Sequence, residues 1–311
     1  MASALFRKGR KVNDYDLFAG HAWYVPGTGG IFVLLAWFLA GNLLASTVLN
    51  VLELFTPPAV LAKYSLLVAY PLSFLPAMVY VSHQSRRNSF FETGYKLESG
   101  HFGPFKAWQM ALITIFLTFA TMIAADLPNY WNYRLSTLFP FMNKYYEAVQ
   151  QMMKGVTDGP FWSSFLLAAV FAPVFEEWLC RGMVLRGLLV RMKPAWAIVV
   201  SALFFAVIHI NPWQALNAFF IGVVMGYVYY KSGSLLLTML IHFVNNATPV
   251  ILSQLPSLEG ADYWLDILPA GVYAAVYAAG LCVLAACLLA FRRIPLAQKR
   301  GNIDSISEDG E

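Results

Sequence analysis

The chain has 311 residues, of which 59% are hydrophobic and only 12% are charged. Soluble globular domains carry about 25% charged residues, so this composition excludes an ordinary soluble domain and indicates a polytopic membrane protein built as one helical bundle. The net charge of +4 does not indicate nucleic-acid binding, because the basic residues follow the membrane topology and form no stripe.

Eight apolar stretches are long enough, at roughly 17–25 residues, to cross the hydrocarbon core as helices. They predict an all-α bundle with spans near residues 30–55, 60–82, 105–126, 161–190, 194–210, 213–231, 234–255 and 268–291. Residues 1–29 hold four basic side chains but no continuous apolar core before Ile31. They are expected to form a cytoplasmic or interfacial arm and not a cleaved signal peptide.

Lys and Arg residues are distributed unevenly between the two sides of the predicted bundle. One side receives most of them, including those of the 292–311 tail, whereas the 256–267 loop on the other side contains three acidic residues and no cation. By the positive-inside rule, both termini are predicted to face the cytoplasm. The region 256–291 then comprises an outer loop and the last span.

The segment 127–160 follows the N-terminal membrane helices at 30–126 and is rich in aromatic residues. Its amphipathic pattern predicts a helix lying on the extracytoplasmic surface. A connector anchored by its tyrosines is favoured over a substrate gate. The segment 161–255, which comes next, contains the polar residues on which a functional assignment depends.

Glu176, Glu177 and Arg181 lie in a stretch that otherwise resembles the interior of a membrane. A charged side chain near the bilayer centre costs about 2.5–3.5 kcal/mol on insertion scales, so such residues usually have a function. Glu177 and Arg181 are four residues apart and can pair on one helix face. Glu176 is rotated by about 100° and is free to meet another helix. A buried ion pair with a spectator glutamate is the structural alternative.

Two histidines interrupt later apolar stretches. His209 precedes Asn211 and Pro212, which break the helix, while His242 and Asn246 are four apart on one face. Counted along the helices from the cytoplasmic side, Glu176 and His209 lie roughly 24 and 20 Å deep, and His242 and Asn246 roughly 12 and 18 Å deep. The depths overlap, so these side chains can converge. An interfacial histidine and an interhelical hydrogen bond are the alternatives.

A glutamate and a histidine at one cavity can activate a water molecule, and a histidine with an asparagine can stabilise an oxyanion. Together they describe hydrolysis of a carbonyl compound, most simply a peptide bond. Gly-x-Ser-x-Gly and His-Glu-x-x-His are both absent from the sequence. A zinc site made of Glu176, His209 and His242 is an alternative, because all three side chains are of types that bind zinc. A non-catalytic immunity or binding protein is a second alternative. A transporter is less favoured.

The polar positions resemble those of the CPBP intramembrane proteases, the type II CAAX prenyl endopeptidase-like proteins also called the Abi family. The resemblance covers roughly residues 161–252. It rests on three motifs, each on its own predicted span: Glu176-Glu177-x-x-x-Arg181, Phe205-x-x-x-His209 and His242-x-x-x-Asn246.

This resemblance implies an eight-helix membrane bundle acting as a metal-independent glutamate protease that needs no cofactor. By position, Glu176 and His209 would activate the water, and His242 with Asn246 would form the oxyanion hole.

The resemblance also implies that Glu177 and Arg181 support the site. The expected partners are membrane lipids and a peptide or protein substrate, with membrane-associated and lipidated substrates among the alternatives. The compact size and short tails favour a bacterial inner membrane.

Overall fold

The computed structural model describes residues 24–84, 102–157, 160–189, 191–209, 211–258 and 263–295. These residues form helices and turns and contain no strand, which confirms the all-α prediction. Most of the predicted N-terminal arm and of the C-terminal tail lies outside the described residues.

Each predicted span corresponds to one helix or to one continuous series of helical segments. The helices that each cover one span are α1 (Thr28–Glu53), α2 (Pro58–Gln84), α4 (Ala107–Ser136), α9 (Pro194–Ile208), α10 (Pro212–Ser232), α11 (Leu235–Leu252) and α13 (Ala270–Arg292). The series covers 161–189. In the described part of the chain, six of these eight are long and apolar enough to cross a membrane, and α9 and α10 are the other two. The protein is therefore an integral, multi-pass membrane protein.

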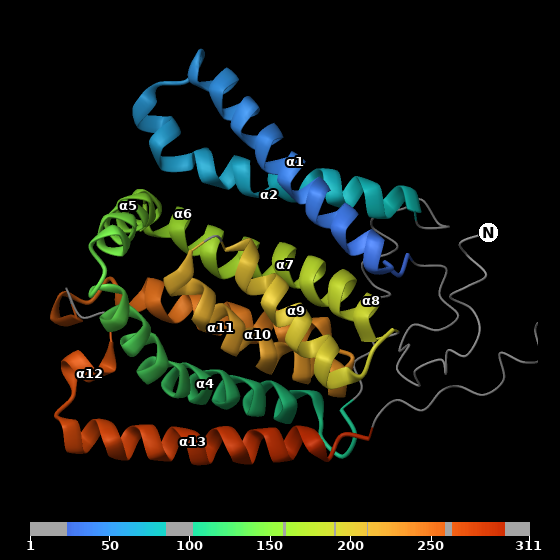
Figure 1. The fold of residues 1–311 in the computed structure, drawn as a ribbon, viewed down its shortest axis with the longest axis vertical. Coiled ribbons are helices and arrows are strands. Elements are labelled where there is room, and N and C mark those ends of the chain that lie inside the picture. The colour runs from blue at the N-terminus through green and yellow to red at the C-terminus, as the bar shows by residue number, and fades with distance from the viewer. Residues whose placement is uncertain are drawn as a thin grey trace, which may run out of the picture.

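Most of the long helices run roughly along one direction, whereas α1 is inclined to them and the helix labelled α5 (Pro140–Thr157) is seen nearly end-on (Figure 1). α1 and α2 form a hairpin on one flank, α4 and α13 pack together on the other, and α9, α10 and α11 lie between them. Gly27 packs against Arg191, and Gly103 packs against Pro295. Figure 1 shows the start of α1 and the end of α13 at the same end of the bundle, in agreement with an even number of spans.

The third span ends later than the sequence analysis predicted. α4 continues through Pro128 to Ser136, although proline lacks the N–H that continues a helix. Side chains beyond Pro128 bind α10: Asn129 donates to Asn217 Oδ1 at 3.3 Å, and Asn132 donates to the Pro212 carbonyl at 3.3 Å. Packing against a neighbouring helix thus stabilises the extension, as is common for proline in membrane helices.

The connector after α4 contains the predicted helix. α5 spans Pro140–Thr157 and lies at the end of the bundle opposite the start of α1 (Figure 1). The rings of Tyr145 and Tyr146 lie with their centroids 5.5 and 5.0 Å from that of Trp213 at the start of α10. Two short elements, η4 (Pro256–Leu258) and α12 (Trp264–Ile267), lie between α11 and α13.

The span at 161–189 is not a uniform α-helix. It consists of α6 (Phe161–Phe165), π-helical η2 (Leu166–Phe171), α7 (Ala172–Glu177), π-helical η3 (Trp178–Leu185) and α8 (Arg186–Leu189). π-Helical turns are rare and occur frequently at functional sites. The sequence analysis did not predict them. They flank α7, which ends on the two glutamates.

Small residues bring α10 close to α9. A Cβ atom placed on Gly222 would lie 3.1 Å from Ala202 Cβ, and one on Gly226 would lie 3.0 Å from Ile198 Cγ2. This is the close approach that two small residues four apart permit in membrane helices. At the other end of α10, Gly233 adopts φ 62°, and Ser234 then caps α11 by accepting the Leu237 N–H at 3.2 Å.

Candidate active site

The first motif forms the predicted ion pair. Arg181 Nη1 donates to Glu177 Oε1 at 2.6 Å, and neither side chain is exposed. Arg181 Nη2 also donates to the Gly222 carbonyl of α10 at 3.1 Å. The guanidinium carbon lies 4.5 Å from the ring centroid of Phe205 on α9, a cation–π contact. A buried charge requires partners of this kind, because an unpaired ion away from water is strongly unfavourable.

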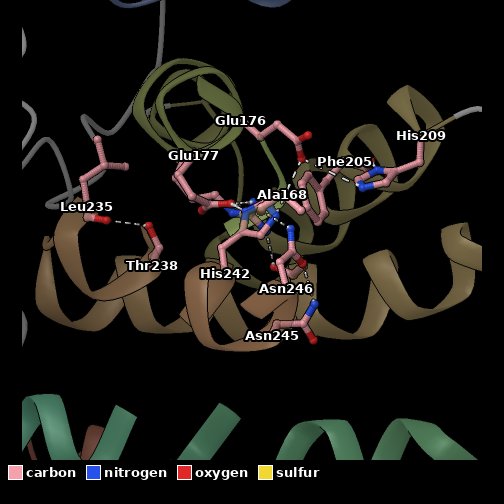
Figure 2. Close-up of polar contacts among 12 residues, drawn as sticks. Ala168, Glu176, Glu177, Phe205, His209, Leu235, Thr238, His242, Asn245 and Asn246 are labelled. Carbon is pink, nitrogen blue, oxygen red and sulfur yellow. Dashed lines mark hydrogen bonds and ion pairs between the residues drawn. The ribbon is translucent and has the colours of Figure 1, made fainter. Parts of the chain in front are cut away.

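Glu176 faces away from this pair and meets two other helices. Its Oε2 atom lies 3.9 Å from His209 Nε2 and 3.9 Å from His242 Nε2. Figure 2 shows the carboxylate extending from α7 toward His209, with His242 below it on α11. The helices therefore bring together three of the four residues whose depths overlapped in the sequence. His209 ends α9 and Asn211 caps α10, as the predicted helix break requires.

Hydrogen bonds at Nδ1 orient both imidazole rings. His209 Nδ1 lies 2.7 Å from the Phe205 carbonyl, and His242 Nδ1 lies 3.0 Å from Glu177 Oε1. A carbonyl and an ion-paired carboxylate only accept hydrogen bonds, so Nδ1 carries the hydrogen in each ring. In the neutral rings Nε2 is consequently an acceptor. Two imidazole nitrogens and Glu176 Oε2 thus form a group of three converging acceptors.

Asn246 is held by a backbone carbonyl of η2. Its Nδ2 donates to the Ala168 carbonyl at 2.9 Å, and its Oδ1 accepts from Asn245 Nδ2 at 3.0 Å. Ala168 is available because Ala172 donates its N–H to Leu167, and Pro173, the next possible donor, has none. A proline thereby frees a carbonyl that a side chain from another helix satisfies, as in many membrane helices.

Tyr70 is a site residue that the sequence analysis missed. Its hydroxyl donates to Glu176 Oε1 from α2, more than 100 positions earlier in the chain. A tyrosine in an apolar span resembles an ordinary packing or interfacial residue, so only the fold reveals this contact. The pairing of His242 with Glu177 was missed for the same reason.

The candidate site lies in a segment that is similar to a known family. Residues 158–248 match the family model described as type II CAAX prenyl endopeptidase Rce1-like. Over this segment the chain is similar to the Rce1-like family. The matched region covers the span series from α6 to α8, then α9, α10 and most of α11, and it includes all six predicted site residues. It ends before α13, and α1, α2 and α4 precede it.

No curated protein and no solved structure matches this chain significantly. The Rce1-like match supports an intramembrane hydrolase of the CAAX endopeptidase type with a protein or peptide substrate. In the described part of the chain, no three His, Cys, Asp or Glu side chains are arranged so that they could hold a metal ion. Tyr70 lies outside the matched segment, on the hairpin that the family model does not cover.

Proposed function

We propose that this protein is an intramembrane endopeptidase that uses Glu176 as the base for an attacking water molecule. The observation that carries the proposal is the 3.9 Å separation of Glu176 Oε2 from Nε2 of both His209 and His242. A membrane protein has no structural need for an extra carboxylate between two imidazoles, because Arg181 is already paired with Glu177.

The three converging acceptors suit a molecule with two hydrogens to donate. A water molecule could donate one hydrogen to Glu176 and the other to His209 Nε2, which orients its lone pair toward a substrate carbonyl. As the water oxygen bonds to the carbonyl carbon, its proton passes to Glu176. The C–N bond then breaks, and the same proton goes to the leaving amine nitrogen. Atoms and charge balance without a cofactor.

The oxyanion formed in this step requires hydrogen-bond donors. Asn246 Nδ2 uses one hydrogen on Ala168 and has a second to offer. His242 can donate from Nε2 only as an imidazolium ion, since Nδ1 already carries a hydrogen. Glu177, 3.0 Å from Nδ1, would stabilise that cation. In this proposal Glu177 and Arg181 support the site by orienting His242.

Replacing Glu176 tests the proposal. The Glu176→Gln protein, nearly isosteric, should lose at least about 100-fold in cleavage, because an amide cannot take the proton. Comparative peptidomics of membranes from cells carrying wild-type or Glu176→Gln protein would measure this and identify the cleaved peptide. Glu53→Gln is the matched control and should retain activity, because Glu53 is exposed at the end of α1. Undiminished cleavage by purified Glu176→Gln protein would refute the proposal.

Two other functions give different results in the same experiments. A non-catalytic immunity or binding protein would retain its protective effect in cells as the Glu176→Gln variant. A zinc hydrolase using Glu176, His209 and His242 would contain stoichiometric zinc and lose activity on chelation, whereas the proposed mechanism predicts cleavage that resists chelators.

We further propose a bacterial inner-membrane location and a membrane-associated or lipidated peptide as substrate.

A further inference from the structure

We propose that Tyr70 is a positioning residue of this active site, holding Glu176 so that one carboxylate oxygen faces both histidines. The inference rests on the proposed role of Glu176 as the base. It assigns a part in catalysis to the α1–α2 hairpin, which lies outside the segment that matches the Rce1-like family.

The two oxygens of Glu176 have different surroundings. Oε1 accepts the Tyr70 hydroxyl hydrogen. Oε2 is buried, has no hydrogen-bond partner among the described residues, and is the atom 3.9 Å from both imidazole nitrogens. A carboxylate with one oxygen bound and the other unbound has a fixed rotation about its terminal bond. The hydrogen bond from Tyr70 therefore selects the oxygen that is presented to His209 and His242.

The position of the Tyr70 ring is determined by aromatic packing and does not depend on the glutamate. Its centroid lies 5.4 Å from that of Phe74 on α2 and 6.4 Å from that of Phe175 on α7. Phe74 and Phe175 in turn stack on each other at 5.4 Å, and Phe74 also contacts Phe38 of α1 at 5.0 Å. The donor is thus preorganised, which lowers the entropic cost of holding the carboxylate in its reactive geometry.

Tyr70→Phe removes the hydroxyl and retains the ring packing. We expect kcat to fall about tenfold while KM stays within about twofold, because the carboxylate is misoriented but the substrate site is unchanged. Thermal unfolding in detergent should change by no more than a few degrees. The substrate for this assay is a synthetic copy of the uncleaved peptide that accumulates in cells carrying Glu176→Gln in the peptidomic comparison.

Tyr80→Phe is the matched control. It makes the same chemical change on the same helix, where the hydroxyl lies 3.3 Å from the Tyr24 hydroxyl and away from the glutamates, and it should leave kcat and KM unaltered. Wild-type kcat in Tyr70→Phe, or an equal fall in both variants, would overturn the assignment. If Glu176→Gln is fully active, the proposed function fails first; if Glu176→Gln is inactive and Tyr70→Phe is normal, only this inference fails.

A substrate-free measurement tests the contact directly. In a double-mutant cycle of Tyr70→Phe and Glu176→Leu, the two changes in thermal midpoint should combine non-additively, because each substitution removes one partner of the same hydrogen bond. The cycle of Tyr80→Phe with Glu176→Leu should be additive. Additivity in the Tyr70 cycle would show that the hydroxyl does not act on this carboxylate, whatever the substrate is.

Discussion

Glu177 Oε1 has two partners, Arg181 Nη1 at 2.6 Å and His242 Nδ1 at 3.0 Å. One carboxylate oxygen therefore neutralises a buried cation and orients a ring that faces Glu176. The i, i+4 spacing was sufficient to predict the first contact, because it depends on one helix alone. The second joins α7 to α11, and no local pattern encodes it.

Removing the cation should be costly for the fold. Arg181→Met leaves Glu177 without its closest counter-charge inside the bundle, and we expect a loss of about 3 kcal/mol in the free energy of unfolding. Thermal or denaturant unfolding in detergent micelles measures this loss. Arg134→Met is the matched control, since Arg134 is exposed at the end of α4 and should matter little. Equal stability of both variants would contradict the argument.

The helical series α6–η2–α7–η3–α8 forms one predicted membrane span and also carries Glu176, Glu177 and Arg181 of the candidate site. Its apolar composition made the span predictable, and its charges indicated the candidate site. The π-helical turns could not be predicted, because they depend on how the helix packs and on where Pro173 leaves a carbonyl without a donor. Likewise, only the fold shows that the glycines of α10 pack closely against α9 and that the Gly222 carbonyl binds Arg181.

Pro173→Ala tests the role of the backbone hydrogen bond that is missing at the Ala168 carbonyl. The new N–H could donate to the Ala168 carbonyl and compete with Asn246, so kcat should fall about tenfold. Thermal stability should not fall, because alanine favours a helix interior and proline does not. The control Pro128→Ala, in α4, should leave kcat unchanged. A parallel loss of activity and stability in Pro173→Ala would instead indicate disrupted packing.

In the whole molecule, the candidate site lies between the α1–α2 hairpin and the pair formed by α4 and α13. The sequence did not predict where these two pairs of helices pack. Hydropathy predicted eight apolar stretches and their order, and six of the corresponding helices in the described residues are long and apolar enough to cross a membrane. The depths of the polar residues followed from helix rise and allowed them to meet. Lateral neighbours are set by packing among many helices, so the contact of α2 with α7 could not be predicted from the sequence.

Topology is tested by labelling from outside the cell. In a variant whose three native cysteines are replaced by alanine, Ser257→Cys should react with a membrane-impermeant maleimide in intact cells, because the 256–267 loop is predicted to be extracytoplasmic. Lys193→Cys, exposed in the turn between α8 and α9, should react only after the cells are permeabilised. The reverse pattern would invert the predicted orientation.

The ion pair in α7 and η3 has a consequence for the synthesis of the chain. Glu177 and Arg181 can neutralise each other as soon as their own helix forms. The carbonyl of Gly222 and the imidazoles of His209 and His242, however, belong to helices that emerge later from the ribosome. Until those helices are in place, Glu176 lies in an apolar environment, and Arg181 is bound to Glu177 but lacks its hydrogen bond to Gly222. Its stable insertion should thus depend on α9 to α11, so a chain truncated after α8 should be retained poorly in the membrane.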